Sequence, residues 1–217
     1  MRMHSILLPV LAGAAIVIAA LPAHAGTYEI QVRMKTPDVR YFGSFTYDTA
    51  KVKGSDPERA RTLTRKVQAF TDPWAQEYLS PDEKTTAYLN MAKPAYFEAE
   101  IQPTADCRRG YVCLSQRSSF STPLIAGSIT DVQARAWSTR GKKADLADFV
   151  SPSDLHAFTD RVKRGIRQAP CVYDLDIKLP ANYSSFPNWV PTTSGIAVWF
   201  PESQFGCQIM EVRVDWP

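Results

Sequence analysis

The stretch Asn188–Pro217, NWVPTTSGIAVWFPESQFGCQIMEVRVDWP, is the part of the sequence that decides the fold of the chain. It contains two runs rich in β-branched and aromatic residues, IAVWF and QIMEVRV, on either side of a loop with Pro201, Gly206 and Cys207. Two such runs around a loop with Pro and Gly are typical of a β-hairpin. The hairpin is predicted to close a sheet, with most of its aromatic side chains in the core and its loop open to a partner. These aromatic residues are Trp189, Trp199, Phe200, Phe205 and Trp216.

Working back from the hairpin, polar and apolar residues alternate in several earlier segments. In TYEIQVRMK the apolar positions Tyr28, Ile30, Val32 and Met34 alternate with polar ones, which is the period of a half-buried strand. The same period returns around Phe97–Ile101, at Val112 and Leu114, and in TDVQARAW. The sequence therefore predicts a sheet made of several short strands.

Two segments have the helical period instead. Ser55–Glu58 has the pattern of a helix start, with a capping serine and a glutamate three residues later, and an apolar face follows until Pro73. SPSD at Ser151–Asp154 is predicted to cap a second helix with the apolar stripe Leu155, Phe158, Val162 and Ile166. Strands that follow one another without crossover helices predict an α+β fold: an antiparallel β-sheet with two main helices packed on one face.

The N-terminal segment has the three parts of a secretory signal peptide. A positively charged start, MRMHS, is followed by the apolar run ILLPVLAGAAIVIAALP and by small residues at Ala23 and Ala25. The apolar run is shorter than the roughly 20 residues that span a bilayer, so no stable membrane insertion is expected after processing. Residues 1–25 are predicted to be removed between Ala25 and Gly26, leaving residues 26–217 as one secreted or periplasmic domain, with association to the cell envelope left open.

All four cysteines lie in the part of the chain that is predicted to be exported. Disulfides persist outside the cytoplasm, and four cysteines allow three pairings. We favour Cys107 with Cys113, because CRRGYVC can turn at Gly110, and Cys171 with Cys207, which would tie the last strand to a distant segment. The predicted fold is therefore disulfide-stabilised.

Composition and motifs argue against several classes of function. The formal net charge is +3 and the basic residues are dispersed, so nucleic-acid binding is not predicted. The sequence has no Cys-x-x-Cys pair, and the predicted mature chain has one histidine, so neither a metal nor a cofactor is predicted.

Three blocks give the chain a family resemblance. The segments KADLADFV and NWVPTTSGIAVWFP, together with Gly206 before the last strand, resemble the secreted family of the mycobacterial immunogenic antigens and the extracytoplasmic domain of the lysozyme-sensing anti-sigma factor RsiV. Family members carry a Gly-Gly-x-His-Pro turn where this chain has PLIAGSITD, in which only Gly127 corresponds. The resemblance implies an α+β domain whose ligand is a protein.

Residues with catalytic potential have simpler interpretations. A Ser-His-Asp hydrolase needs three converging groups, and the Gly-x-Ser-x-Gly elbow is absent. His156 lies in the first turn of the second helix, where we expect a surface residue. The pairs Glu98 with Glu100 and Asp174 with Asp176 could serve glycoside hydrolysis or bind calcium, but such spacing is also usual on a solvated sheet face. The basic residues of the second helix are expected to be solvated.

The sequence therefore favours a non-enzymatic binding domain over a secreted esterase or cell-wall hydrolase, and over a structural envelope protein without a ligand. The expected ligand is a protein, either lysozyme-like or from a host, or an envelope glycan. Two loops carry the predicted contact residues, because Arg and aromatic side chains are enriched at interface hot spots. These residues are Arg108, Arg109, Tyr111, Pro201 and Phe205. The sequence leaves the oligomeric state open.

Overall fold

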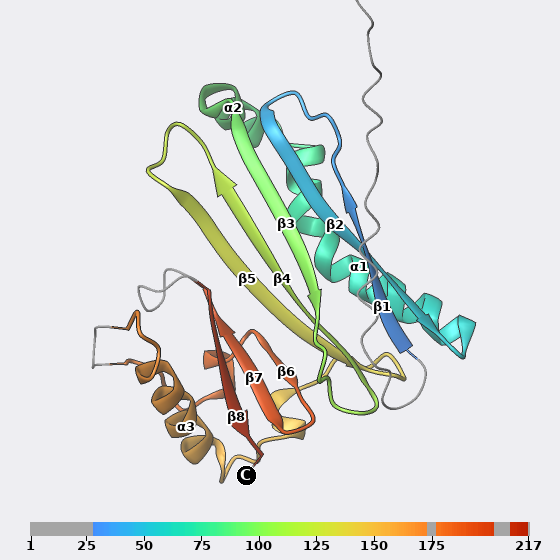
Figure 1. Cartoon of the computed structure of the whole chain (residues 1–217), viewed down its shortest axis with the longest axis vertical. Helices are drawn as coiled ribbons and strands as arrows, with labels where there is room; N and C mark the ends of the chain where they lie inside the picture. Colours follow the sequence, from blue (N-terminus) through green and yellow to red (C-terminus); the bar gives the residue numbers. More distant parts are fainter. Residues whose placement is uncertain (1–27, 173–176, 202–208, 217) are drawn as a thin grey trace, which may run out of the picture.

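Two β-sheets and three α-helices make up the fold (Figure 1). The computed structural model describes residues 28–172, 177–201 and 209–216. The strands are β1 Tyr28–Lys35, β2 Phe42–Gly54, β3 Ala95–Pro103, β4 Tyr111–Ser121, β5 Ser128–Ser138, β6 Trp189–Pro191, β7 Gly195–Phe200 and β8 Met210–Asp215. The helices are α1 Pro57–Leu79, α2 Glu83–Ala92 and α3 Leu155–Arg167, with short 3-10 turns η1 Leu146–Asp148 and η2 Tyr183–Ser185. The predicted α+β class is confirmed.

The larger sheet has the strand order β1-β2-β3-β4-β5, and all of its neighbouring strands except β2 and β3 are antiparallel. The predicted antiparallel sheet is confirmed with one exception, the parallel pair β2 and β3. Helices α1 and α2 connect β2 to β3 and form a crossover, which returns the chain to the same end of the sheet, so the two strands run in parallel. The sequence pattern predicts the first helix, but it does not show that this helix belongs to a crossover connection.

Helix α1 differs from its prediction at both ends. Asp56, not Ser55, is the N-cap residue, and its Oδ1 accepts hydrogen bonds from the backbone N–H groups of Glu58 and Arg59 at 3.0 and 3.1 Å. The helix does not stop at Pro73 but continues to Leu79. Pro73 is exposed, so the carbonyl left without its N–H donor can bond to water, while Ala75 on the next turn is buried.

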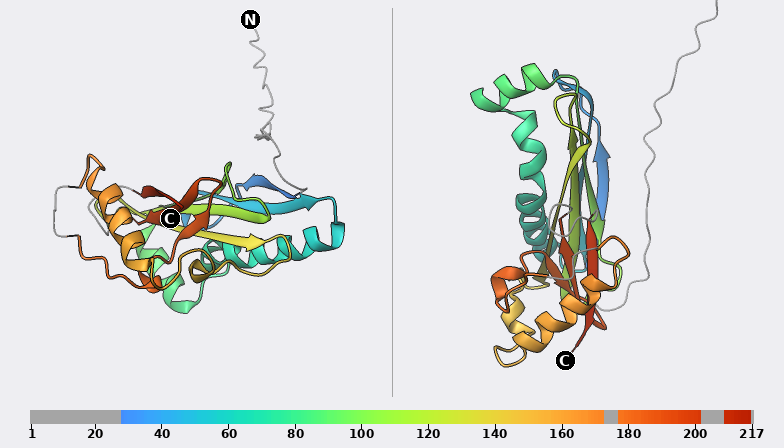
Figure 2. Two further views of the ribbon diagram at one scale, coloured as in Figure 1. Left: turned by 90° about the horizontal axis from the view of Figure 1, so that it is seen from below. Right: turned by 90° about the vertical axis from the view of Figure 1, so that its left-hand side faces the viewer.

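The two main helices cover different sheets, which corrects the prediction that both lie on one face. Helix α1 lies along the five-stranded sheet, while α3 lies at the other end of the molecule and packs against β8 (Figure 2). Leu63, Val67 and Phe70 of α1 form one core cluster with Leu114 and Trp137 of the large sheet. The physical reason for the difference is that the C-terminal strands form a second sheet, β6-β7-β8, which needs its own cover.

The predicted terminal hairpin is confirmed as β7 and β8, which pair in antiparallel register from Gly195↔Asp215 to Phe200↔Met210. Trp199 and Phe200 are buried, as expected. Ala134 and Ala136 of β5 belong to the same core cluster as the hairpin, whereas Trp137 packs with α1. The end of β5 therefore buries both faces and joins the two sheets. None of the described helices has the length and apolar character needed to cross a membrane.

Candidate functional site

The segment between β3 and β4 forms a disulfide-closed loop, as predicted. Cys107 and Cys113 are bonded, with Cα atoms 5.7 Å apart. Gly110 has φ +86°, a backbone conformation that glycine adopts without strain, and the N–H of Tyr111 donates to the carbonyl of Arg108 at 3.1 Å. Cys171 is also disulfide-bonded, and its predicted partner Cys207 lies outside the described residues.

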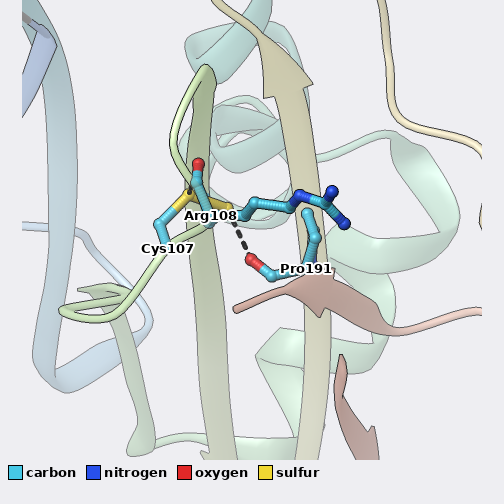
Figure 3. Close-up of a disulfide and its surroundings, with 4 residues drawn as sticks. Cys107, Arg108 and Pro191 are labelled. Carbon is cyan, nitrogen blue, oxygen red and sulfur yellow. Dashed lines mark hydrogen bonds between the residues drawn. A yellow bond between two sulfur atoms is a disulfide. The ribbon is translucent and has the colours of Figure 1, made fainter. Parts of the chain in front are cut away.

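The loop lies against the turn between β6 and β7 (Figure 3). The N–H of Arg108 donates to the carbonyl of Pro191 at 3.0 Å, and the N–H of Thr193 donates to the carbonyl of Asp106 at 2.8 Å. The Sγ atom of Cys113 lies 3.5 Å from the same Pro191 carbonyl, a close contact rather than a hydrogen bond because a disulfide sulfur carries no proton. The backbone of the loop is therefore fixed to the second sheet.

The side chain of Arg108 completes a cluster of aromatic rings. Its guanidinium carbon lies 4.6 Å from the ring centre of Trp216 and 5.5 Å from that of Phe149. The rings of Phe149 and Trp216 are stacked, with centres 5.8 Å apart. Tyr111 and Trp189 contact Phe149 at ring-centre distances of 5.4 and 5.5 Å. We call these five residues, Arg108, Tyr111, Phe149, Trp189 and Trp216, the Arg108 platform.

An ion-pair network supports the platform from the side. Arg213 of β8 donates to Glu211 at 2.6 Å and also bonds to Asp106, just before the disulfide. Burial acts to lower the pKa of Arg213, but hydrogen bonds and charge from Glu211 and Asp106 outweigh this effect and raise the pKa above its ordinary value. The Arg213 guanidinium therefore stays charged and ties the loop to β8.

The structure brings together some of the predicted contact residues and separates others. Arg108 and Tyr111 belong to the platform, and Arg109 is exposed beside them. Pro201 follows Phe200, at the end of the β7–β8 hairpin opposite to Gly195, Asp215 and the platform. Phe205 lies outside the described residues. Strand β7 spans six residues, so the two ends of the hairpin are about 17 Å apart and Pro201 does not share one continuous surface with Arg108.

Sequence reasoning did not assign Phe149, Trp189 and Trp216 to a common site. Phe149 comes from the turn after η1, Trp189 begins β6 and Trp216 follows β8. The sequence predicts that most aromatic residues of the terminal hairpin are buried. Trp189 is buried, but Trp216 is only partly buried, as is Phe149 of the preceding segment. Only the docking of the disulfide loop brings a cation to these rings, and no local pattern shows that contact.

The residues with catalytic potential do not converge in the part of the chain that the structure describes. His156 is a surface residue of α3, as expected, and its Nε2 lies 3.6 Å from Asp160 on the same helix. The hydroxyl of Ser151 instead donates to Asp154 at 2.6 Å. Asp174 and Asp176 lie outside the described residues. Among the described residues, no group of three or more His, Cys, Asp and Glu side chains could hold a metal ion.

Glu98 and Glu100 share the open face of the large sheet, as predicted, and lie near Asp48 of β2. Asp48 Oδ2 accepts a hydrogen bond from the backbone N–H of Ile101 at 3.0 Å. Burial raises the pKa of Asp48; the hydrogen bond partly opposes this effect, and the charges of Glu100 and Glu98 add to it. The carboxyl groups thus repel one another on a solvated face, and Arg117 lies directly opposite Glu100 on β4.

No family model matches the sequence, and no curated protein matches it. The fold, in contrast, is that of solved proteins of the DUF3298 family. A DUF3298 protein from Pseudomonas aeruginosa aligns over 90% of this chain and 91% of its own, with a TM-score of 0.54 and 13% identity. A second member, from Bacteroides fragilis, aligns over 89% and 92%, with a TM-score of 0.58 and 13% identity.

At 13% identity these two likenesses show the fold alone. DUF3298 is a domain family related to RsiV-like extracytoplasmic domains, so the fold agrees with the resemblance that the sequence suggested to RsiV. The likeness to the mycobacterial antigens stays a prediction.

Proposed function

We propose that this protein is an exported, non-enzymatic binding domain that recognises a protein ligand through the Arg108 platform and the neighbouring Arg109. The ligand is lysozyme-like or comes from a host, in line with the resemblance to the RsiV domain. An envelope glycan is the alternative ligand, and the capture experiment below would distinguish it from a protein. The predicted signal peptide supports a location outside the cytoplasm.

One observation carries the proposal: an exposed arginine is held over two partly buried aromatic rings on a surface with little freedom to move. The disulfide, the bonds to Pro191 and Thr193 and the Arg213 network fix the backbone on both sides of Arg108. Arg and aromatic residues dominate binding energy at protein interfaces, and a rigid surface loses little entropy on association. Arg109 is exposed on the same loop and adds a second cation.

The test is capture of a partner from envelope extract and host fluid by the mature protein. The Arg109→Ala variant is expected to weaken capture about thirtyfold, since a hot-spot truncation costs on the order of 2 kcal/mol, while the thermal midpoint stays within about 1 °C. Arg164→Ala, an exposed cation on α3, is the matched control and should capture the partner normally.

Two results would overturn the proposed function. One is capture that survives the combined Arg108→Ala and Arg109→Ala changes. The other is hydrolysis of an ester or of peptidoglycan that disappears in His156→Ala, because that activity would restore the hydrolase alternative. Sequencing the N-terminus of protein from culture fluid or periplasm tests the exported location and should begin near Gly26.

A further inference from the structure

Strand β5 is the last strand of the large sheet, so one row of its backbone groups faces away from β4. N–H and C=O of one residue point to the same side of a strand and alternate between residues. The outward residues are the even-numbered ones, because Ser138 N–H donates to Lys142 at 2.8 Å and the carbonyl of Ala136 accepts from Ala144 at 2.9 Å. The segment 142–144 thus covers one end of this edge.

The side chain of Asn188 covers the other end of the edge. Its Nδ2 donates to the carbonyl of Val132 at 3.0 Å, and its Oδ1 accepts from the N–H of Ala134 at 3.3 Å. Between the two covers remain the carbonyl of Ala134 and the N–H of Ala136. Neither has a hydrogen-bond partner among the described residues. Both residues are 2% exposed, and buried backbone groups are normally paired with protein groups or with water.

These two groups border a hollow of about 320 Å³, which we call the β5 edge pocket. Its lining includes Ala134, Ala136, Lys142, Lys143, Leu146 and Trp189. A hollow of this volume is large enough for a small ligand, and its wall combines polar and apolar groups. The apolar part of the wall is contributed by Leu146, Phe186 and Trp189, and the last of these also belongs to the Arg108 platform.

The charges around the β5 edge pocket favour an anion. The cations Lys142 and Lys143 line it, against the single carboxylate of Asp145. Lys142 pairs with Asp148 at 3.2 Å. Asp145 caps the η1 turn by accepting from the N–H of Ala147. The Arg135 guanidinium packs over the ring of Phe70 on α1 at 4.3 Å, so its charge is used on the other face of β5. Within the described ranges Lys143 has no carboxylate partner, so one positive charge at the pocket remains uncompensated.

We propose that the β5 edge pocket binds the C-terminal residue of a peptide. One residue lying parallel to β5 and opposite Arg135 would donate its N–H to the carbonyl of Ala134. Its carboxylate would accept from the N–H of Ala136. In this direction the carboxylate lies near Trp137. Lys143 is the residue opposite Trp137 in an antiparallel β-bridge.

The space along the strand selects a chain end. Ala134 and Ala136 are two residues apart, about 7 Å, which leaves room for the main chain of one residue. A further residue would meet Ala144, which already bonds to the carbonyl of Ala136. A terminal carboxylate has no further residue, and it supplies the negative charge that the pocket lacks. The residues before it would have to leave the edge of β5 before Asn188, which occupies the N–H of Ala134. This inference does not depend on the protein ligand proposed for the Arg108 platform.

The experiment uses three forms of one probe on the mature, ¹⁵N-labelled protein. The first is acetyl-Ala-Ala-Leu with a free carboxylate, the second is the same peptide with a C-terminal amide, and the third is methylated on the nitrogen of the last residue. The free acid should shift the amide resonance of Ala136. The amide and the N-methyl form should each bind about tenfold more weakly, because each removes a charge or a hydrogen bond.

Protein variants provide the second arm. Lys143→Gln should weaken binding of the free acid about tenfold and leave binding of the amide unchanged. Lys53→Gln, an exposed lysine on β2, is the matched control and should bind the free acid normally. Equal affinity for the acid and the amide, or an unshifted Ala136 resonance at millimolar free acid, would overturn the assignment. Because Arg109→Ala tests the platform separately, failure of one proposal is distinguishable from failure of the other.

Discussion

Gly195 is the residue whose replacement should harm the fold most directly. A Cβ atom built at this position falls on the backbone carbonyl of Val214, which cannot move without shifting β8. We predict that Gly195→Ala lowers the free energy of unfolding by about 3 kcal/mol or more, measured by urea denaturation. Gly43→Ala is the control: its Cβ would meet only the ring of Tyr96, which is 47% exposed and can swing away. Similar losses in the two variants would contradict this reading of the clash.

Asp48 gives a prediction about pH. Because its pKa is raised in the folded protein, the ionised carboxylate opposes folding, and that penalty disappears as the pH falls through the folded pKa toward the ordinary value of 3.8. Asp48→Asn should therefore raise the thermal midpoint at pH 7, and the gain should shrink to nothing below pH 3.8. Asn can still accept from the N–H of Ile101. A gain that is constant with pH, or that also appears in Asp38→Asn at an exposed site, would argue against the mechanism.

At the scale of one element, α1 tolerates a proline in its interior. A proline there removes a helix hydrogen bond and costs about 3 kcal/mol relative to alanine. The helix continues because Trp74, Ala75, Tyr78 and Leu79 pack with the aromatic core of β2 and β3. Pro73→Ala is expected to raise the free energy of unfolding by about 1 to 3 kcal/mol, while Glu77→Ala at an exposed site of the same helix should change it by less than about 0.5 kcal/mol. An unchanged Pro73→Ala variant would be inconsistent with a strained helix.

The elements also show what local patterns can predict. Strands β3 and β8 alternate between exposed and buried positions, and α3 carries a continuous apolar stripe, so each is visible in the sequence. Strands β1 and β5 alternate between polar and apolar residues in sequence, although β1 has no buried position and the end of β5 is buried on both faces. Helix α2 has two buried residues in ten and no strong apolar stripe, so the sequence pattern does not predict it. The parallel pairing of β2 with β3 depends on where a crossover goes, and the Arg108 platform depends on a contact between distant segments. Neither depends on any local pattern.

For the whole molecule, the disulfide loop joins the two sheets. Removing a bridge between cysteines with a sequence separation of 6 should cost about 2 kcal/mol in the chain-entropy model. Cys107→Ser combined with Cys113→Ser is therefore expected to lower the midpoint of urea unfolding modestly and to leave the second disulfide intact. Replacing Cys171 should cost more if its bridge closes the longer loop predicted from the sequence. A larger loss from the Cys107–Cys113 pair would contradict the loop-length argument.

The bond between Asp106 and Arg213 has a consequence for the order of folding. The two residues are 107 positions apart, so this contact can form only after most of the chain has been brought together. Helix α1 and its neighbouring strands contact segments that are nearer to them in the sequence. In pulse-labelled hydrogen exchange during refolding, the amides of Arg108 and Thr193 should gain protection after those of the β4–β5 ribbon. In a newly made molecule the large sheet would then form first, and the surface proposed for binding would form last.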